Sequence, residues 1–157
     1  MKKLIYAAAL TLATISFNPV AYRNPMTAAV RFPYIVSSVQ FPQTKVRFFR
    51  HSFRLQIPEG NSALSQLNIE VPDGLTVRNN ISVSDQSGRK INTNISVNGN
   101  KIIIAFPQPV APVTRLNIEM NNVKRTGVSN AWLYPVSVRF ASSNADIPIG
   151  VAEFPVY

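Results

Sequence analysis

Hydrophobic and polar residues alternate along most of this chain in short runs, which are separated by turns rich in Gly, Pro, Asn and Asp. The clearest run is Ile91–Phe106, in which Asn98-Gly99 marks a two-residue β-hairpin loop. A loop at Gly99-Asn100 instead shifts the pairing by two residues and keeps the same faces. In either register one face of the hairpin is apolar and is expected to be buried, namely Ile95, Ile102, Ile104 and Phe106.

Similar alternation predicts further strands, with none of the 3.6-residue apolar period of a helix beyond the N-terminal segment. Short extended pieces between prolines, Ala28–Phe32 and Tyr34–Phe41, predict edge strands or loops laid over the sheet. The other predicted strands lie around Leu67–Val71, Ile81–Val83, Leu116–Met120, Trp132–Phe140 and Pro148–Val156. This spacing is typical of an all-β fold, an antiparallel two-sheet sandwich of the immunoglobulin-like kind.

The stretch from Thr44 to Ile57 changes its apolar parity. Val46 and Phe48 lie at even positions, whereas Phe53 and Leu55 lie at odd positions. We therefore expect a β-bulge or short break within Phe49–Ser52, with Phe48 on the buried face. A single extra residue there would place Lys45, Arg47 and Arg54 together on the outer face.

Two later segments are expected to connect strands. Phe106–Pro112 contains three prolines and predicts a stiff crossing from one sheet to the other. Asn121–Asn130 predicts a basic polar loop around Lys124, Arg125 and Gly127.

The first residues are typical of an export signal. Lys2 and Lys3 precede 14 uncharged residues, Leu4–Phe17, which is short for a membrane span and suited to a secretory apolar region. Cleavage after Ala21 or after Ala29 is compatible with the sequence, and an uncleaved anchor is the alternative. We expect residues 1–29 to be a signal peptide and residues 30–157 to be one β-sandwich domain, exported to the periplasm, the cell surface or the medium.

Composition limits the chemistry of this domain. The 157 residues include no cysteine, which excludes disulfides, thiolate metal sites and lipoprotein attachment. The net charge is +9, and it is +6 once Lys2, Lys3 and Arg23 are removed. A basic exported protein would meet acidic polysaccharide or other envelope polymers rather than nucleic acid. We expect no membrane span after signal cleavage, and no cofactor.

From about Val30 to Tyr157 the chain resembles a family of exported cyanobacterial proteins known only as a domain of unknown function (DUF2808-like). The segments that carry the resemblance are Leu55–Asn61, Leu64–Ile69, Ile104–Val110, Trp132–Val138 and Gly150–Tyr157. They are strand and turn signatures rather than catalytic motifs. The resemblance implies export and a β-fold, and it transfers no catalytic residue.

Candidate chemistry in the sequence is sparse. His51, the one histidine, would be the base of an envelope hydrolase, although a histidine at the surface or strand edge is the simpler interpretation. A carboxylate pair such as Glu70 and Glu119 is the other catalytic option. Asp73-Gly74 and Asp85–Gly88 offer oxygen ligands for calcium but are equally explained as turns.

The densest basic and aromatic cluster surrounds Phe48, Phe49 and Phe53. Its cations form a candidate polyanion-binding surface, Lys45, Arg47, Arg50 and Arg54. Trp132 and Tyr134 share parity, so they form either a sugar-stacking platform or a core pair. The sequence therefore favours a non-catalytic exported protein that binds or organises an envelope or extracellular component, with an envelope hydrolase and a structural subunit of a surface assembly as alternatives.

Overall fold

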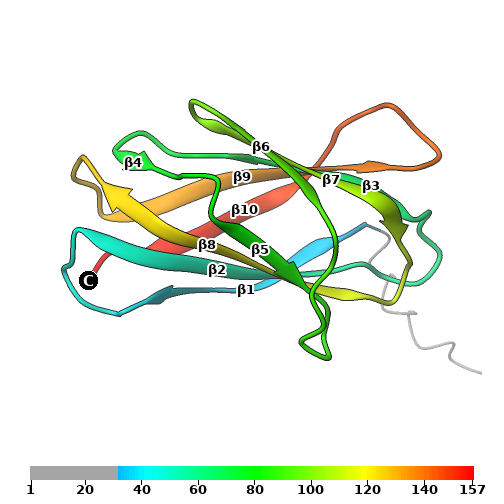
Figure 1. Ribbon diagram of the computed structural model, residues 1–157, viewed down its shortest axis with the longest axis horizontal. Coiled ribbons are helices and arrows are strands. Elements are labelled where there is room, and N and C mark those ends of the chain that lie inside the picture. The colour runs from blue at the N-terminus through cyan, green and yellow to red at the C-terminus, as the bar shows by residue number, and fades with distance from the viewer. Residues whose placement is uncertain (1–31) are drawn as a thin grey trace, which may run out of the picture.

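The computed structural model describes residues 32–157, which form ten strands and no helix in that range. The strands make two antiparallel five-stranded sheets, and Figure 1 shows them running along the long axis of the molecule. The first sheet has the order β1-β2-β8-β4, with β5 also paired to β8, and consists of Tyr34–Phe41 (β1), Phe48–Gln56 (β2), Leu75–Thr76 (β4), Ile81–Ser84 (β5) and Arg115–Arg125 (β8). The second has the order β10-β9-β3-β7-β6 and consists of Leu64–Glu70 (β3), Asn94–Asn98 (β6), Lys101–Val110 (β7), Ala131–Phe140 (β9) and Ile147–Pro155 (β10).

The fold is the predicted immunoglobulin-like antiparallel sandwich, and alternation explains its core. In β2 and β9, and in β8 up to Met120, every second residue points between the sheets and is buried. The largest fully buried side chains come from both layers and include Phe53, Leu55, Leu67, Ile104, Leu116, Trp132 and Phe154. At one side of the sandwich the edge strands β1 and β10 approach each other, and the Ser38 hydroxyl donates a hydrogen bond to the backbone oxygen of Glu153.

The central hairpin has the predicted buried and exposed faces. Of the two registers considered, it adopts the one with the loop at Gly99-Asn100. Asn98 pairs with Lys101, so the loop is Gly99-Asn100. Of these two residues only Gly99 has positive φ (60°), which fits a type II′ turn rather than type I′. Ile102, Ile104 and Phe106 are buried as expected. Ile95 is only half-buried, because β6 is the outermost strand of its sheet.

The predicted break in β2 is wrong. Odd positions of β2 are buried without interruption from Phe49 to Leu55, and Phe48 is 51% exposed instead of buried. The irregularity lies in the partner strand β8, where the register shifts opposite Phe49 and His51 and Asn122 adopts φ 54°. A bulge in β8 absorbs the extra residue, so β2 itself keeps one buried face.

The two predicted connections are shorter than expected. Strand β7 continues through Pro107 and Pro109 to Val110, and the chain crosses between sheets only at residues 111–114. Strand β8 likewise runs to Arg125, which leaves residues 126–130 as the loop. Tyr34–Phe41 is an edge strand as predicted, whereas Ala28–Phe32 lies largely, and the signal segment wholly, outside the described residues.

Candidate polyanion-binding face

The outer face of β2 carries the even-numbered residues Phe48, Arg50, Ser52 and Arg54. Arg54 is exposed, and Arg50 is partly buried with its guanidinium carbon 5.4 Å from the centre of the Phe41 ring. Arg50 and Arg54 therefore share a face because the strand alternates without a break, and they lie about 13 Å apart along it.

Lys45 and Arg47 lie in the loop before β2. Because β2 has no bulge, they are not brought onto its outer face with Arg54, as the sequence had predicted. Both are exposed, and the guanidinium carbon of Arg47 lies 5.7 Å from the centre of the Phe48 ring. The backbone oxygen of Arg47 accepts a hydrogen bond from the Arg125 amide at 2.9 Å, which ties this loop to the end of β8. We call Lys45, Arg47, Arg50 and Arg54 the basic stripe.

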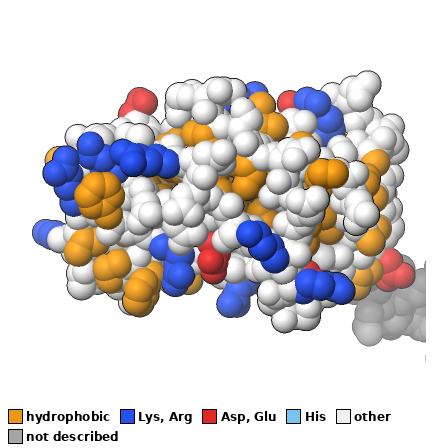
Figure 2. All heavy atoms as spheres, viewed as in Figure 1, with side chains coloured by type: hydrophobic (Ala, Val, Ile, Leu, Met, Phe, Trp, Pro, Cys, Tyr) orange, Lys and Arg blue, Asp and Glu red, His pale blue; other side chains and the backbone are white. Residues whose placement is uncertain are grey.

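Acidic neighbours are scarce around the basic stripe. Within residues 32–157 the ion pairs are Arg89–Asp85 and Arg139–Asp146, and neither includes a residue of the stripe. Glu119 lies opposite Ser52 on β8, and its carboxylate accepts a hydrogen bond from the Asn117 amide. Figure 2 shows Lys and Arg side chains in several groups on one face of the molecule, one of them beside hydrophobic side chains, and few acidic ones.

The stripe reaches a shallow cleft at one end. Arg54 and Arg115 line this cleft, which has a volume of about 320 Å³, together with Ser84, Asp85, Gln86, Gly88 and Asn117. The Asp85 carboxylate is already engaged by Ser87 and Arg89. Arg115 is held there by a hydrogen bond from its Nε to the Gln56 side chain at 3.2 Å. The arrangement presents cations at intervals along an exposed surface, and such a surface attracts polyanions more readily than it holds one small ligand.

The prediction that His51 lies at the surface or at a strand edge is wrong. The residue is 0% exposed. Its Nε2 lies 3.1 Å from the Gln40 oxygen and its Nδ1 lies 2.8 Å from the Tyr134 hydroxyl. These partners assign the proton to Nε2, with the Tyr134 hydroxyl donating to Nδ1. The ring also stacks on Phe154 at a centroid distance of 4.0 Å.

Both ring nitrogens of His51 are thus occupied inside the protein. Burial, and then the positive charge of Arg125, lower the pKa of His51 from 6.5 to about 3, so the ring is neutral near pH 7. Burial likewise raises the pKa of Tyr134 above its usual range. A base with no path to a substrate and no free lone pair does not fit a hydrolytic site.

The other candidate residues are explained by the fold. Glu70 and Glu119 belong to opposite sheets, so they form no pair. The Asp85 carboxylate accepts hydrogen bonds from the amides and side chains of Ser87 and Arg89, and the Ser87 hydroxyl bond foremost lowers its pKa to about 2. Within the described residues no three His, Asp or Glu side chains gather where they could hold a metal ion.

Trp132 and Tyr134 are both buried, so they form a core pair and not a sugar-stacking platform. In residues 32–157 we find no helix long and apolar enough to cross a bilayer.

The family model described as "Protein of unknown function (DUF2808)" matches residues 26–151. The chain belongs to this family. No curated protein matches it.

Among solved structures, the chain is similar to the N-terminal domain of the Streptococcus gordonii adhesin Sgo0707, with a TM-score of 0.54 and 10% identity over 82% of this chain and 33% of the other. It is also similar to ACE19, the collagen-binding subdomain of the Enterococcus faecalis surface protein ACE (0.50, 10%, covering 79% and 97%). A third similar structure is the major pilin subunit BcpA of Bacillus cereus (0.51, 10%, covering 79% and 40%). The chain thus spans about a third of the first structure, and at these identities the likeness shows the fold alone.

Proposed function

We propose that this protein is an exported, non-catalytic β-sandwich that binds acidic polysaccharide of the envelope or the extracellular matrix. The basic stripe is the binding surface. The observation that carries the proposal is that Arg50 and Arg54 on the outer face of β2, and Lys45 and Arg47 in the loop before it, have no ion-pair partner among residues 32–157.

Electrostatics favours an extended anionic polymer over a compact ligand. Exposed charges in water act over about one Debye length, roughly 8 Å at physiological salt, so each cation contributes modestly and several must act together. A polymer with repeated carboxylates can contact Lys45, Arg47 and Arg54 at once, whereas a single small anion cannot. Binding of this kind is weak per contact and sensitive to salt.

The start of the sequence supports the export that this proposal includes. Lys2 and Lys3 followed by the uncharged run Leu4–Phe17 support export through a signal peptide, with cleavage after Ala21 or Ala29. Intact mass of the secreted protein tests this part. We expect a mature chain that begins near residue 22 or 30, and a secreted chain that retains Leu4–Phe17 would contradict cleavage.

The binding claim is tested on immobilised alginate, an acidic polysaccharide, with neutral dextran as the control matrix. We expect wild-type protein to be retained on alginate alone and to elute as salt is raised. The variant Lys45→Glu/Arg47→Glu/Arg54→Glu should elute without retention. Elution of both proteins at the same salt concentration would show that the stripe is ordinary solvated surface.

Packing within a larger surface assembly is a second candidate function. The outward side chains of edge strand β1 are exposed and apolar, namely Tyr34, Val36, Val39 and Phe41, and Phe48 of β2 is exposed as well. An exposed apolar row at a sheet edge is a common site of association. Sedimentation at rising concentration tests it: self-association that Val39→Ser/Phe41→Ser abolishes would favour assembly, and a monomer throughout would oppose self-assembly through β1.

A further inference from the structure

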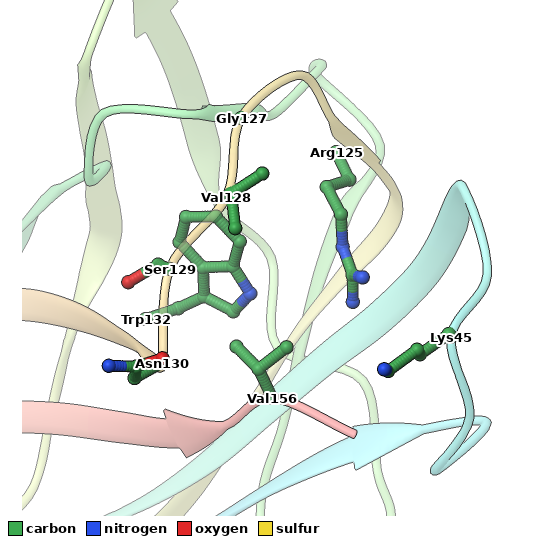
Figure 3. A pocket seen from close by; sticks show the side chains of 8 residues that line it. All are labelled: Lys45, Arg125, Gly127, Val128, Ser129, Asn130, Trp132 and Val156. Atoms are coloured by element: carbon green, nitrogen blue, oxygen red, sulfur yellow. The ribbon is translucent and has the colours of Figure 1, made fainter.

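A cleft of about 410 Å³ opens beside the loop that joins β8 to β9. Figure 3 shows the side chains of Arg125 and Lys45 reaching toward it from one side and Trp132 and Val128 lying on the other. Ser129, Asn130 and Val156 complete the lining. The cleft is of the size that small-molecule sites commonly have, and Lys45 makes it continuous with the basic stripe.

The wall formed by the loop is held in place by two glycines. The backbone oxygen of Gly74 accepts hydrogen bonds from the amides of Thr126 and Gly127 at 2.8 and 3.0 Å. A Cβ atom added at Gly127 would lie 2.8 Å from the Cα of Gly74, so both positions require glycine for this approach. The benzene end of the Trp132 indole packs against Gly74, which turns its pyrrole end toward the cleft.

Arg125 and Trp132, on opposite sides of the cleft, both carry buried donors that have no acceptor. Trp132 is 1% exposed, and its Nε1 makes no hydrogen bond. Nε and Nη2 of Arg125 are buried and equally without a partner. In Figure 3 the indole nitrogen and the guanidinium group face each other across a gap. Neither an arginine nor a tryptophan side chain can accept a hydrogen bond, so the group that satisfies them must come from outside the pair.

We propose that this cleft binds the carboxylate of one acidic sugar residue, with Arg125 and Trp132 as the donors and Lys45 at the opening. Nε and Nη2 form one edge of the guanidinium group, and this edge matches the two oxygens of a carboxylate. Arg125 is partly buried as a whole while its Nε and Nη2 are buried, so a carboxylate in the cleft reaches both atoms once the guanidinium group rotates toward it. The Trp132 N–H supplies a third donor to the same group.

The rest of the lining suits a sugar ring. Val128 and Val156 offer apolar surface for the face of a ring. The identity of the ligand as a sugar rests on the proposed function, because the basic stripe leads into the cleft through Lys45. The cleft would then select carboxylated polysaccharides from among the polyanions that the stripe attracts.

Trp132 is the one tryptophan of the chain, so its indole N–H gives a single, assigned nitrogen–proton signal in NMR spectra. We would titrate the labelled protein with D-glucuronate, with D-glucose as the uncharged sugar and acetate as the carboxylate without a ring. The account predicts a saturable shift with glucuronate, a weaker one with acetate and none with glucose. Arg125→Gln should raise the apparent Kd for glucuronate at least about tenfold. The charge-matched control Lys101→Gln, an exposed cation at the start of β7 that lines neither cleft, should leave it unchanged.

An indole signal that glucuronate does not move, or moves no more than glucose does, would overturn the proposal and leave a trapped water as the acceptor. Equal responses to acetate and glucuronate would overturn the assignment to a sugar. The two proposals fail separately. Alginate retention that depends on the stripe, with an unmoved indole signal, would contradict the cleft alone; a shifted indole signal with stripe variants that elute like wild type would contradict the stripe alone.

Discussion

The two faces of strand β2 differ in the surroundings of their ionisable side chains. On the inner face His51 is buried, both of its ring nitrogens are hydrogen-bonded, and its pKa is lowered to about 3. On the outer face Arg50 and Arg54 make no ion pair with any residue of the described chain. On β2 the residue with the most reactive side chain, His51, therefore has a structural role, whereas the side chains accessible to a ligand offer positive charge.

Arg125 combines features of the buried His51 and of the exposed arginines. Its guanidinium carbon lies 5.5 Å from the centre of the Phe49 ring, so it belongs to the inner layer as well as to the cleft. It adds to the lowering of the His51 pKa, and two of its own nitrogens have no partner. A buried donor without an acceptor costs about 1–3 kcal/mol, and a bound anion would recover that loss.

The two faces of β2 should differ most in how much a substitution lowers the free energy of unfolding. Phe53→Ala should lower the free energy of unfolding by about 3–5 kcal/mol, because it leaves a cavity in the core. Arg54→Ala, one residue along and exposed, should change it by less than about 0.5 kcal/mol. Urea denaturation of the two variants measures this. Similar losses for both would mean that the faces of β2 are wrongly assigned.

The inner face should also make stability depend on pH. The pKa of His51 is lower in the folded state than its value of 6.5 in the unfolded state, so the unfolded chain binds the extra proton. Stability is therefore full above pH 6.5 and falls as the pH drops toward 3, by about 3 kcal/mol on reaching about pH 4. Denaturant titrations across this range test it against His51→Gln, in which this pH dependence should disappear. A wild type whose stability is flat between these pH values would contradict the buried, neutral His51.

A smaller loss is expected when the partner of His51 is removed. Tyr134→Phe keeps the buried ring and deletes the hydroxyl that donates to Nδ1, so the free energy of unfolding should fall by about 1–3 kcal/mol. The pKa of His51, followed by the NMR signals of its ring, should stay below 6.5 because burial is its main cause. Tyr34→Phe is the control, since Tyr34 is exposed and should lose almost nothing.

Alternation alone predicts most of this fold. The hairpin faces, the strands around Leu67, Leu116 and Trp132, and the sandwich class all follow from period-two patterns and turn residues. The exposure of Phe48 was not predicted. Phe48 and Phe49 are adjacent aromatic residues, so the sequence does not show which of the two faces the core. A bulge in β8 is not visible from the sequence of β2, since the pairing of strands distant in the chain decides where it lies.

The candidate site was predictable only as a set of cations. The sequence shows Lys45, Arg47, Arg50 and Arg54, but which acidic residues lie near them, such as Glu119 opposite Ser52, depends on which strands flank β2. The burial of His51 could have been predicted, since it lies at an odd position of the strand, like Phe49 and Phe53. The cleft of Arg125 and Trp132 was not, because it depends on the contact between Gly74 and Gly127, which are far apart in sequence.

We propose that polyanions bind to the cations of the basic stripe in particular, and not to the net positive charge of the whole protein. Arg47→Gln/Arg54→Gln removes two exposed cations of the stripe, and Lys90→Gln/Lys101→Gln removes two exposed cations elsewhere, so both variants have the same net charge. The measurement is the salt concentration at which each elutes from immobilised alginate. The account predicts that the stripe variant elutes well before wild type and that the control variant elutes close to it. Equal losses in the two variants would contradict a binding face on β2.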